Sequence, residues 1–338
     1  MANRNVVIGV DGGNSKTDYL LFDADGNYID HIHAGTCSHE RFPDAYASTY
    51  RMMSETIGQL LERNRLTLSD VAAAAFGLAG ADLPSQKERL CEVIERIGFG
   101  RYAVDNDSFL GVKAGTSNGY GVCSINGSGM CTGGISPSGK RLQIGGIGSE
   151  LTGDEAGGYY IGRKILRTVY DSFYRMGRST EMADPVMELL GVSSKELFIE
   201  TAADLIQKRA VPNTELMRIM FAAAENGDPA ALDIIDHSAK QLALSTAGCI
   251  RNLDFGDEVD IVLAGSVWVK AESPLLLDTY KQYVEQWTLP RCRFIVLDAP
   301  PATGAVFWAL ELALGRPADE AIRRKIMSAP AYSGAGSM

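Results

Sequence analysis

The order of apolar and polar positions predicts a group of short strands at the start of the chain and a similar group further on. Apolar runs separated by glycine-containing turns are typical of strands joined by hairpins. The first group lies at Val6–Val10, Thr17–Phe22 and Tyr28–Ile32, and the second at Gly121–Ile125, Met130–Ile135 and Leu142–Ile144. The groups start about 115 residues apart, and such self-similarity indicates a duplicated lobe, although two hairpin groups can also arise by chance.

Most other apolar positions recur every three to four residues, which predicts helices. The expected helices lie at residues 43–63, 83–97, 155–176, 194–208, 214–226, 229–252, 274–287, 304–314 and 319–327, and further strands at 71–78, 103–104, 261–264 and 294–297. Asp228 followed by Pro229 is typical of a helix N-cap with proline in the first turn. The alternation predicts an α/β fold, and the hairpins favour mixed sheets with flanking helices over all-parallel sheets.

The length of 338 residues suggests two domains. The stretch AGTSNGYG supplies a flexible crossing near residues 115–120, so we expect one lobe at 1–117 and another at 118–338. The last helix is a candidate to pack back on the first lobe. The C-terminal SGAGSM is expected to fray.

Composition narrows the class of protein. The net charge is −10 and no Lys/Arg stripe is present, which excludes a nucleic-acid or anionic-membrane surface. We find neither a signal peptide nor an apolar stretch of membrane-spanning length, and we therefore expect a cytoplasmic protein. The six cysteines, at 37, 91, 123, 131, 249 and 292, form no CxxC pair, so reduced thiols and no zinc site are expected.

Four glycine-containing turns each follow an apolar strand. They are DGGNSKT at 11–17, NGSG at 126–129, LAGSVW at 263–268 and ATGA at 302–305. Glycine lets backbone N–H groups approach an anion, so such turns can hold phosphate. Any one of them alone is more simply a tight turn, but the four in this order favour a nucleotide site. Neither a P-loop nor a Rossmann fingerprint is present.

Two carboxylates stand out as candidates for chemistry. Asp107 follows a short strand near the expected lobe junction, where it could accept a proton from a hydroxyl. It could equally cap a helix that begins at Ser108. Asp154, with Glu155, could bind sugar hydroxyls or provide charge for the first turn of the next helix, and the two roles are compatible.

These motifs resemble those of the N-acetylglucosamine kinase family, which is grouped with the BadF/BadG/BcrA/BcrD ATPases in the actin/hexokinase-like superfamily. The segments that carry the resemblance are VIGVDGGNSKTDYLLFD, NGSGMCTGG, GGIGSELTGDEAGGYYIGRKIL, IVLAGSVW and PPATGAVFWAL. The resemblance spans residues 5–315. It implies two ribonuclease H-like lobes with ATP in the cleft between them.

The resemblance also implies site residues. Asp11 matches a carboxylate that positions Mg²⁺, and Asp107 matches the catalytic base, which also contacts the sugar. The implied ATP-binding residues are Gly12, Gly13, Asn14, Ser15, Lys16, Thr17, Gly127, Ser128, Gly129, Gly265, Ser266, Gly304 and Ala305. The other implied sugar-binding residues are Ser38, His39, Asn106, Gly146, Gly148 and Asp154. From the residues alone, Lys16 could be a solvated strand residue and His39 a surface-loop histidine.

The expected function is therefore ATP-dependent phosphorylation of the 6-hydroxyl of an amino sugar, N-acetylglucosamine or glucosamine. The partners expected are the sugar, ATP and, by analogy, a second subunit, with Mg²⁺ but no zinc or iron–sulfur cluster. Departures from the family pattern leave the C2 substituent open: Cys37–Glu40 replaces an Asn-His pair, Ile147 replaces a frequent Trp, and Gly148–Gly153 is one residue longer.

Two alternatives belong to other classes of protein. One is an ATPase that activates a dehydratase through a [4Fe–4S] cluster, but the stretch Met130–Gly134 does not match the cysteine-containing segment of those proteins. The other is a non-catalytic sugar or nucleotide sensor, against which the presence of Asp107 and Asp154 argues.

Overall fold

The computed structural model describes residues 5–270 and 273–330, so the predicted fraying of the C-terminal SGAGSM lies outside the described residues. The first of its two mixed sheets has the strand order β3-β2-β1-β4-β5. Its strands are β1 (Val6–Gly12), β2 (Lys16–Asp23), β3 (Tyr28–Gly35), β4 (Val71–Leu78) and β5 (Tyr102–Asp105). The first three strands form an antiparallel meander, while β4 and β5 run parallel to β1.

The second sheet repeats this arrangement in the order β10-β9-β6-β7-β8. Its strands are β6 (Gly121–Asn126), β7 (Met130–Ile135), β8 (Arg141–Gly145), β9 (Glu258–Ala264) and β10 (Arg291–Val296). Again three strands form a meander and two parallel strands extend it. The predicted duplication of a mixed α/β unit is confirmed.

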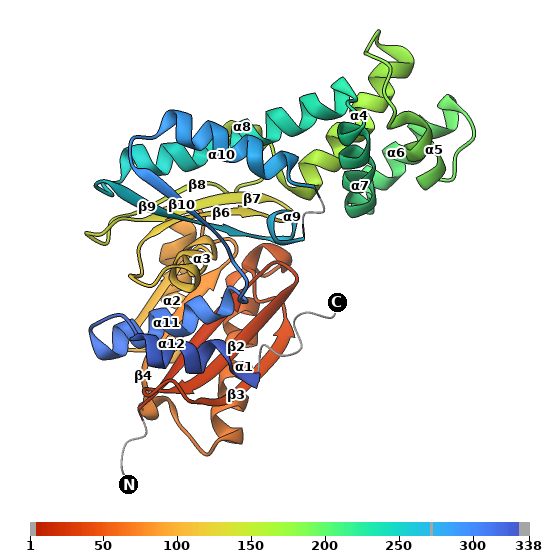
Figure 1. Cartoon of the computed structure of the whole chain (residues 1–338). Coiled ribbons are helices and arrows are strands. Elements are labelled where there is room, and N and C mark those ends of the chain that lie inside the picture. Colours follow the sequence, from red (N-terminus) through yellow and green to blue (C-terminus); the bar gives the residue numbers. More distant parts are fainter. Residues whose placement is uncertain (1–4, 271–272, 331–338) are drawn as a thin grey trace.

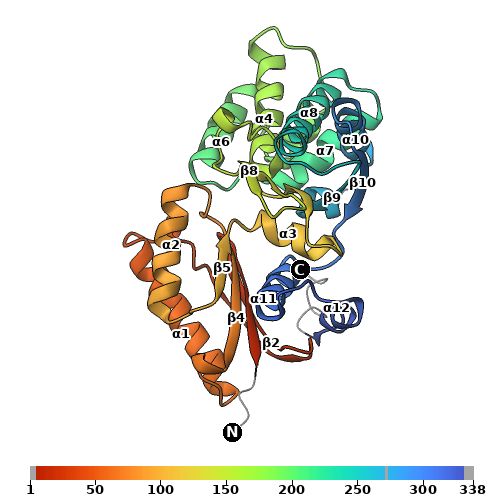
Figure 2. The ribbon, with the colours of Figure 1, turned by 90° about the vertical axis from the view of Figure 1, so that its left-hand side faces the viewer.

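Helices cover both faces of the first sheet, which explains why β1 is apolar on both sides. Figure 2 shows α1 (Tyr46–Arg63) and α2 (Pro84–Ile97) on one face, and α11 (Ala302–Leu314) with α12 (Glu320–Met327) on the other. Thus the last helices of the chain lie on the sheet that its first residues form. Short 3₁₀ turns occur at His39–Arg41, Leu68–Asp70 and Glu150–Thr152.

The second sheet carries the larger helical part (Figure 1). Long helices α8 (Pro229–Asn252) and α10 (Leu275–Trp287) cross one face of the sheet. Beyond them project α4 (Gly157–Tyr174), α5 (Ala183–Leu189), α6 (Lys195–Gln207) and α7 (Asn213–Glu225), and a short α9 (Ser266–Val269) follows β9. The predicted cap of α8 is confirmed, because Asp228 Oδ1 accepts hydrogen bonds from the Ala230 and Ala231 N–H groups at 2.8 and 2.9 Å.

A buried helix, α3 (Ser108–Gly115), lies between the two sheets and against α11. Glycines at its contacts with neighbouring elements allow close packing. A Cβ on Gly77 of β4 would clash with the Leu110 side chain, and one on Gly304 of α11 would clash with the Leu110 carbonyl. A Cβ on Gly111 of α3 itself would clash with Cys123. The α3 backbone is therefore held from several sides at van der Waals distance.

The close contact at Gly304 makes this position sensitive to added volume. We expect Gly304→Ala to lower the free energy of unfolding by about 2–4 kcal/mol, because the obstacle is backbone and cannot rotate away. A matched control is Gly58→Ala in α1, where a Cβ would meet nothing within 4 Å. That change should leave the stability equal or raise it by about 0.5–1 kcal/mol. Thermal unfolding of both variants tests the difference, and equal midpoints would contradict the packing argument.

Candidate active site

The structure brings together two of the predicted glycine turns. Gly265, at φ +96°, faces the NGSG turn so closely that a Cβ would lie 2.6 Å from the Asn126 carbonyl carbon and oxygen. Asn126 is fully buried, and neither side-chain amide atom has a hydrogen-bond partner among the described residues. Buried polar groups are rarely left unpaired. The turn therefore fits a polar ligand that would complete it.

The first residues of α4 are hydrogen-bonded to the NGSG turn. The N–H groups of Gly158 and Tyr159 donate to the carbonyl oxygens of Gly127 and Ser128 at 2.8 and 2.9 Å. Gly157 has φ +79°, and a Cβ there would lie 2.6 Å from the Gly129 carbonyl carbon. Ser128 and Gly129 themselves remain exposed. The turn is thus rigidly seated on α4, with its tip open to solvent.

A cavity of about 420 Å³ adjoins Gly265. It lies between α7 and α9 and is lined by Thr214, Met217, Arg218, Phe221, Ser266, Val267 and Lys270. Its mixture of apolar and polar side chains suits a small molecule. Of these residues only Ser266 was predicted from the sequence. The α7 residues were missed because they carry no local motif and meet the cavity only through the fold.

The first glycine turn joins β1 and β2. The Gly13 N–H donates to the Lys16 carbonyl oxygen at 2.8 Å, and Asn14, Ser15 and Lys16 are exposed. Lys16 pairs with Asp18 at 3.4 Å at the surface.

The two ends of this turn are less accessible. Thr17 is fully buried, and its hydroxyl accepts a hydrogen bond from the Cys37 N–H at 3.1 Å. Gly12 is also buried, close to the side chains of Cys37 and Leu78. The exposed tip of the turn is therefore better placed for a ligand than Gly12 or Thr17.

Asp11 and Asp107 are half-buried carboxylates that interact with each other. Burial, and secondarily the charge of Asp107, raises the pKa of Asp11 to about 7. Burial, and secondarily the charge of Asp82, raises the pKa of Asp107 to about 6, which the backbone N–H groups of Ser108 and Asp107 partly offset. Two neighbouring carboxylates in a partly buried site favour the binding of a cation, and carboxylates are suitable ligands for Mg²⁺.

Asp107 does not make the capping hydrogen bond that was one interpretation of its position. Asn106, one residue earlier, takes that place: its Oδ1 accepts the Ser108 N–H at 2.9 Å. Asp107 occupies the N-cap position of α3, but the interpretation of its carboxylate as the capping group was wrong.

Asp154 organises the loop that follows β8. Its carboxylate accepts the N–H groups of Gly146 at 3.0 and 3.1 Å, Gly148 at 2.6 Å and Ser149 at 3.3 Å. It precedes α4, which begins at Gly157, so it does not lie in the first turn of that helix. The predicted sugar-binding residues Gly146, Gly148 and Asp154 thus form one unit, in which the carboxylate holds the loop.

Ser38 and His39 lie in a buried segment after β3, so the interpretation of His39 as a surface-loop residue was wrong. The His39 ring stacks on Tyr46 with centroids 4.3 Å apart and lies against Gly80. Burial lowers the pKa of His39, which favours the neutral ring. Ser38 Oγ and His39 Nδ1 have no hydrogen-bond partner among the described residues. These two atoms are therefore candidates for hydrogen bonds to a ligand.

Gly304 and Ala305 are buried where α11 crosses α3 and β1, and a Cβ on Gly9 of β1 would lie 2.6 Å from the Val306 nitrogen. Helix packing accounts for small residues at these two positions, so their predicted contact with a nucleotide stays a prediction. Within the described ranges, no group of three or more His, Cys, Asp or Glu side chains forms a metal cluster, and no helix is long and apolar enough to cross a membrane.

Comparison with known proteins first defines a class. A structure from Chromobacterium violaceum, described as a candidate N-acetylglucosamine kinase, superposes with a TM-score of 0.64 at 19% identity and covers 91% of this chain and 99% of its own. A ROK family glucokinase from Streptomyces griseus gives a TM-score of 0.54 at 17% identity, with 90% and 98% coverage. The fold is therefore that of the actin/hexokinase-like sugar kinases.

The family follows from the sequence. The model of the BadF/BadG/BcrA/BcrD ATPase family matches residues 8–309, so the chain belongs to this family. It is 26% identical over 307 residues to an N-acetylmuramic acid/N-acetylglucosamine kinase of Clostridium acetobutylicum, with 90% of this chain and 97% of the relative covered. It is 25% identical over 322 residues to an N-acetyl-D-glucosamine kinase of Dictyostelium discoideum, with 91% and 98% covered.

The raised pKa values make a prediction about stability. A carboxyl whose pKa is higher in the folded state stabilises the fold when protonated, and this contribution is lost as pH rises through the folded pKa of about 6 to 7. Without ligands, Asp11→Asn and Asp107→Asn should therefore raise stability by about 1–2 kcal/mol at roughly pH 8, and by much less at roughly pH 5. Thermal midpoints at both pH values measure this.

Asp228 provides a control of opposite sign. Burial alone would raise its pKa, but the N–H groups of Ala231 and Glu181 outweigh burial and lower it. Such a group stabilises the fold above its unfolded pKa and loses this contribution as pH falls. Asp228→Asn should therefore not stabilise the protein at about pH 8. If the thermal midpoints of all three variants changed equally with pH, the raised pKa values of Asp11 and Asp107 would be contradicted.

Proposed function

We propose that the protein is an ATP-dependent sugar kinase that phosphorylates the 6-hydroxyl of an amino sugar, N-acetylglucosamine or glucosamine. The observation that carries the proposal is the pair of interacting carboxylates Asp11 and Asp107, both of raised pKa, with Asp11 directly preceding the first glycine turn. The names of the two curated relatives support a sugar kinase. A cytoplasmic location and a homodimer remain predictions.

In the proposed mechanism, each part of the chain has a distinct task. The nucleoside occupies the cavity beside Ser266, and the phosphates lie between the NGSG turn and the exposed tip of the first turn. Asp11 is the residue that would hold a divalent metal, whose chemistry is to neutralise charge on the phosphates. Asp107 accepts the proton as the sugar hydroxyl attacks, and its pKa of about 6 keeps it ionised at neutral pH.

The sugar would lie against the segment containing Ser38 and His39 and the loop that Asp154 organises. Ser38 Oγ and His39 Nδ1, which are buried without a hydrogen-bond partner in the described part of the chain, are the groups that we assign to a sugar substituent. Asn106, next to Asp107, has its amide committed to protein groups, at 2.8 Å to Asp82 and 2.9 Å to Ser108. We therefore assign Asn106 a supporting role and assign recognition to the neighbouring groups.

A screen of ADP release with Mg·ATP tests the proposal directly. Glucosamine, N-acetylglucosamine, N-acetylmannosamine and glucose are the acceptors, and an amino sugar should give the highest kcat/KM. Asp107→Asn should lower kcat by about 10²–10⁴-fold. For the wild type, kcat/KM should fall as pH drops below about 6, because the protonated carboxyl cannot accept a proton.

Other outcomes of the screen decide between classes of protein. No turnover of any hexose would sink the sugar-kinase proposal. Sugar binding without turnover would favour a sensor, and so would an Asp107→Asn variant that behaves like the wild type. ATP hydrolysis that no sugar stimulates would favour an ATPase of the dehydratase-activating type.

The proposed nucleoside cavity can be blocked without touching the sugar side. Ser266 is exposed at its rim, so Ser266→Trp should fold and should raise the KM for ATP about tenfold or more, with little change in the KM for sugar.

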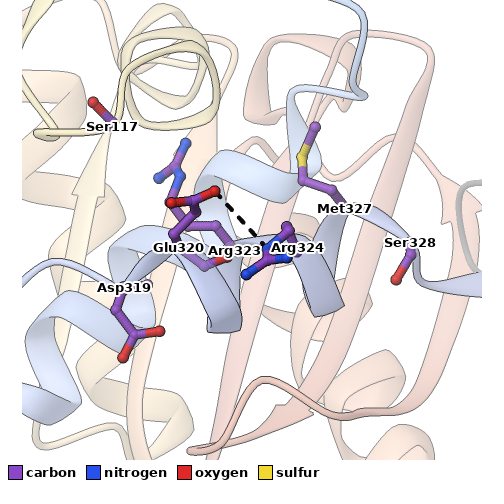
Figure 3. A pocket seen from close by; sticks show the side chains of 8 residues that line it. Ser117, Asp319, Glu320, Arg323, Arg324, Met327 and Ser328 are labelled. Carbon is purple, nitrogen blue, oxygen red and sulfur yellow. Dashed lines mark hydrogen bonds and ion pairs between the residues drawn. The ribbon is translucent and has the colours of Figure 1, made fainter.

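A matched control is Ser328→Trp, at a separate cavity of about 590 Å³ beside α12 (Figure 3). There Arg324 pairs with Glu320 at 4.0 Å. The control should leave both KM values unchanged. An unchanged KM for ATP in Ser266→Trp would place the nucleoside elsewhere.

A further inference from the structure

Asp82 connects the two sheets beside Asp107. It follows β4, and its Oδ1 accepts hydrogen bonds from Asn106 Nδ2 at 2.8 Å and from Gln143 Nε2 at 2.7 Å. Asn106 follows β5 of the first sheet, whereas Gln143 lies in β8 of the second. One carboxylate oxygen therefore bridges the two halves of the molecule, immediately next to the proposed catalytic base.

The contact with Asn106 fixes the backbone around Asp107. Asn106 is buried, and its amide is used at both ends: Oδ1 accepts the Ser108 N–H, and Nδ2 donates to Asp82. An ionised carboxylate accepts hydrogen bonds but cannot donate them. Asp82 therefore selects the orientation of the Asn106 amide in which Nδ2 faces it. The other orientation would also lose the bond to Ser108. Asp107 thus lies between two residues whose relative position this chain of hydrogen bonds sets.

The contact with Gln143 extends this arrangement to the second lobe. Gln143 Nε2 also lies 3.1 Å from the Gly145 carbonyl oxygen, at the start of the loop that Asp154 organises. A second link runs parallel to the first, because buried Asp105 binds Arg141 of β8 at 2.8 Å and Lys87 of α2 at 2.9 Å. Both links are made within two residues of Asp107.

The charge of Asp82 is not matched by a cation. Among the ion pairs between described residues, none includes Asp82, and its two side-chain donors are neutral amides. Burial raises its pKa, and the charges of Glu40 and Asp154 add to this rise, which the hydrogen bonds from Gln143 and the Gly80 N–H only partly offset. A carboxylate in this environment costs stability, so stability alone does not explain it.

We propose that Asp82 is a positioning residue, which orients Asp107 through Asn106 and links this orientation to the second lobe through Gln143. The proposal rests on the proposed function, because it assigns Asp82 a part in proton transfer from the sugar. It distinguishes Asp82 from the residues that bind substrate, since both hydrogen bonds of its Oδ1 are directed to protein.

Kinetics of matched variants test the proposal, with the hexose that the wild type phosphorylates fastest. Asp82→Ala removes the acceptor and should lower kcat by about 10–100-fold, with both KM values within about twofold of the wild type. Asp82→Asn retains Oδ1 as an acceptor and should restore kcat to within about threefold. Gln143→Ala should lower kcat, and adding it to Asp82→Ala should cause little further loss, because the two residues act together.

Amide hydrogen exchange tests the geometry without any substrate. Asp82→Ala and Gln143→Ala should both speed exchange in the segment 106–110, while Asp82→Asn and the distant helix α8 should show no change. This measurement decides the positioning part of the proposal even if the wild type phosphorylates no hexose. Gln143 lies on the half-exposed strand β8, so Gln143→Ala should fold. It can therefore be measured even if Asp82→Ala does not fold.

Each contrary outcome has a distinct meaning. A raised KM for sugar with unchanged kcat would make Asp82 a sugar ligand and overturn the proposal. So would an Asp82→Asn variant as slow as Asp82→Ala, because the charge and not the acceptor would then matter. Unchanged kcat together with unchanged exchange in Asp82→Ala would remove any positioning role.

Discussion

The close packing around α3 is the constraint on which the rest of the site depends. This helix starts at Ser108, directly after Asp107. Where it packs against the two sheets and α11, one of the two contacting residues is a glycine at which a Cβ would clash. Because the obstacles include backbone, α3 has little freedom to shift or rotate. A carboxylate attached to the start of an immobilised helix is placed by the core of the protein, which is what proton transfer over a short distance requires.

Around this rigid centre the chain gathers negative charge at the expense of stability. Asp11, Asp82 and Asp107 raise one another's pKa or have it raised by burial, whereas Asp105 nearby is paired with two cations. A chain selected for stability alone would pair or replace the first three. Asp105 is thus a structural carboxylate, whereas the environment of the other three is consistent with the roles proposed for them in phosphoryl transfer, which depends on neutralising charge.

The sequence predicted the elements whose causes are local. Strands such as β1 are apolar runs that end at glycine turns, and α8 begins at an Asp-Pro pair that caps it. Helix α3 entered the sequence analysis only as the helix that Asp107 could cap, because it is short and buried on all sides, and the seven-residue α5 was not predicted. Asp82 and the α7 side of the cavity were missed for a related reason: their neighbours are distant in sequence, and no spacing encodes the contact.

The glycine turns show where a motif stops being informative. Gly265 and Gly304 each follow the family pattern, and at each a side chain would collide with backbone. At Gly265 the backbone belongs to the exposed turn Asn126–Gly129, beside a cavity, so the glycine serves a site that can take a ligand. At Gly304 it belongs to buried α3, so the glycine serves helix packing. A sequence shows that backbone must come close at both positions, but only the fold shows what approaches. Packing at Gly304 nevertheless contributes to the site, because the helix that it holds is the one that presents Asp107.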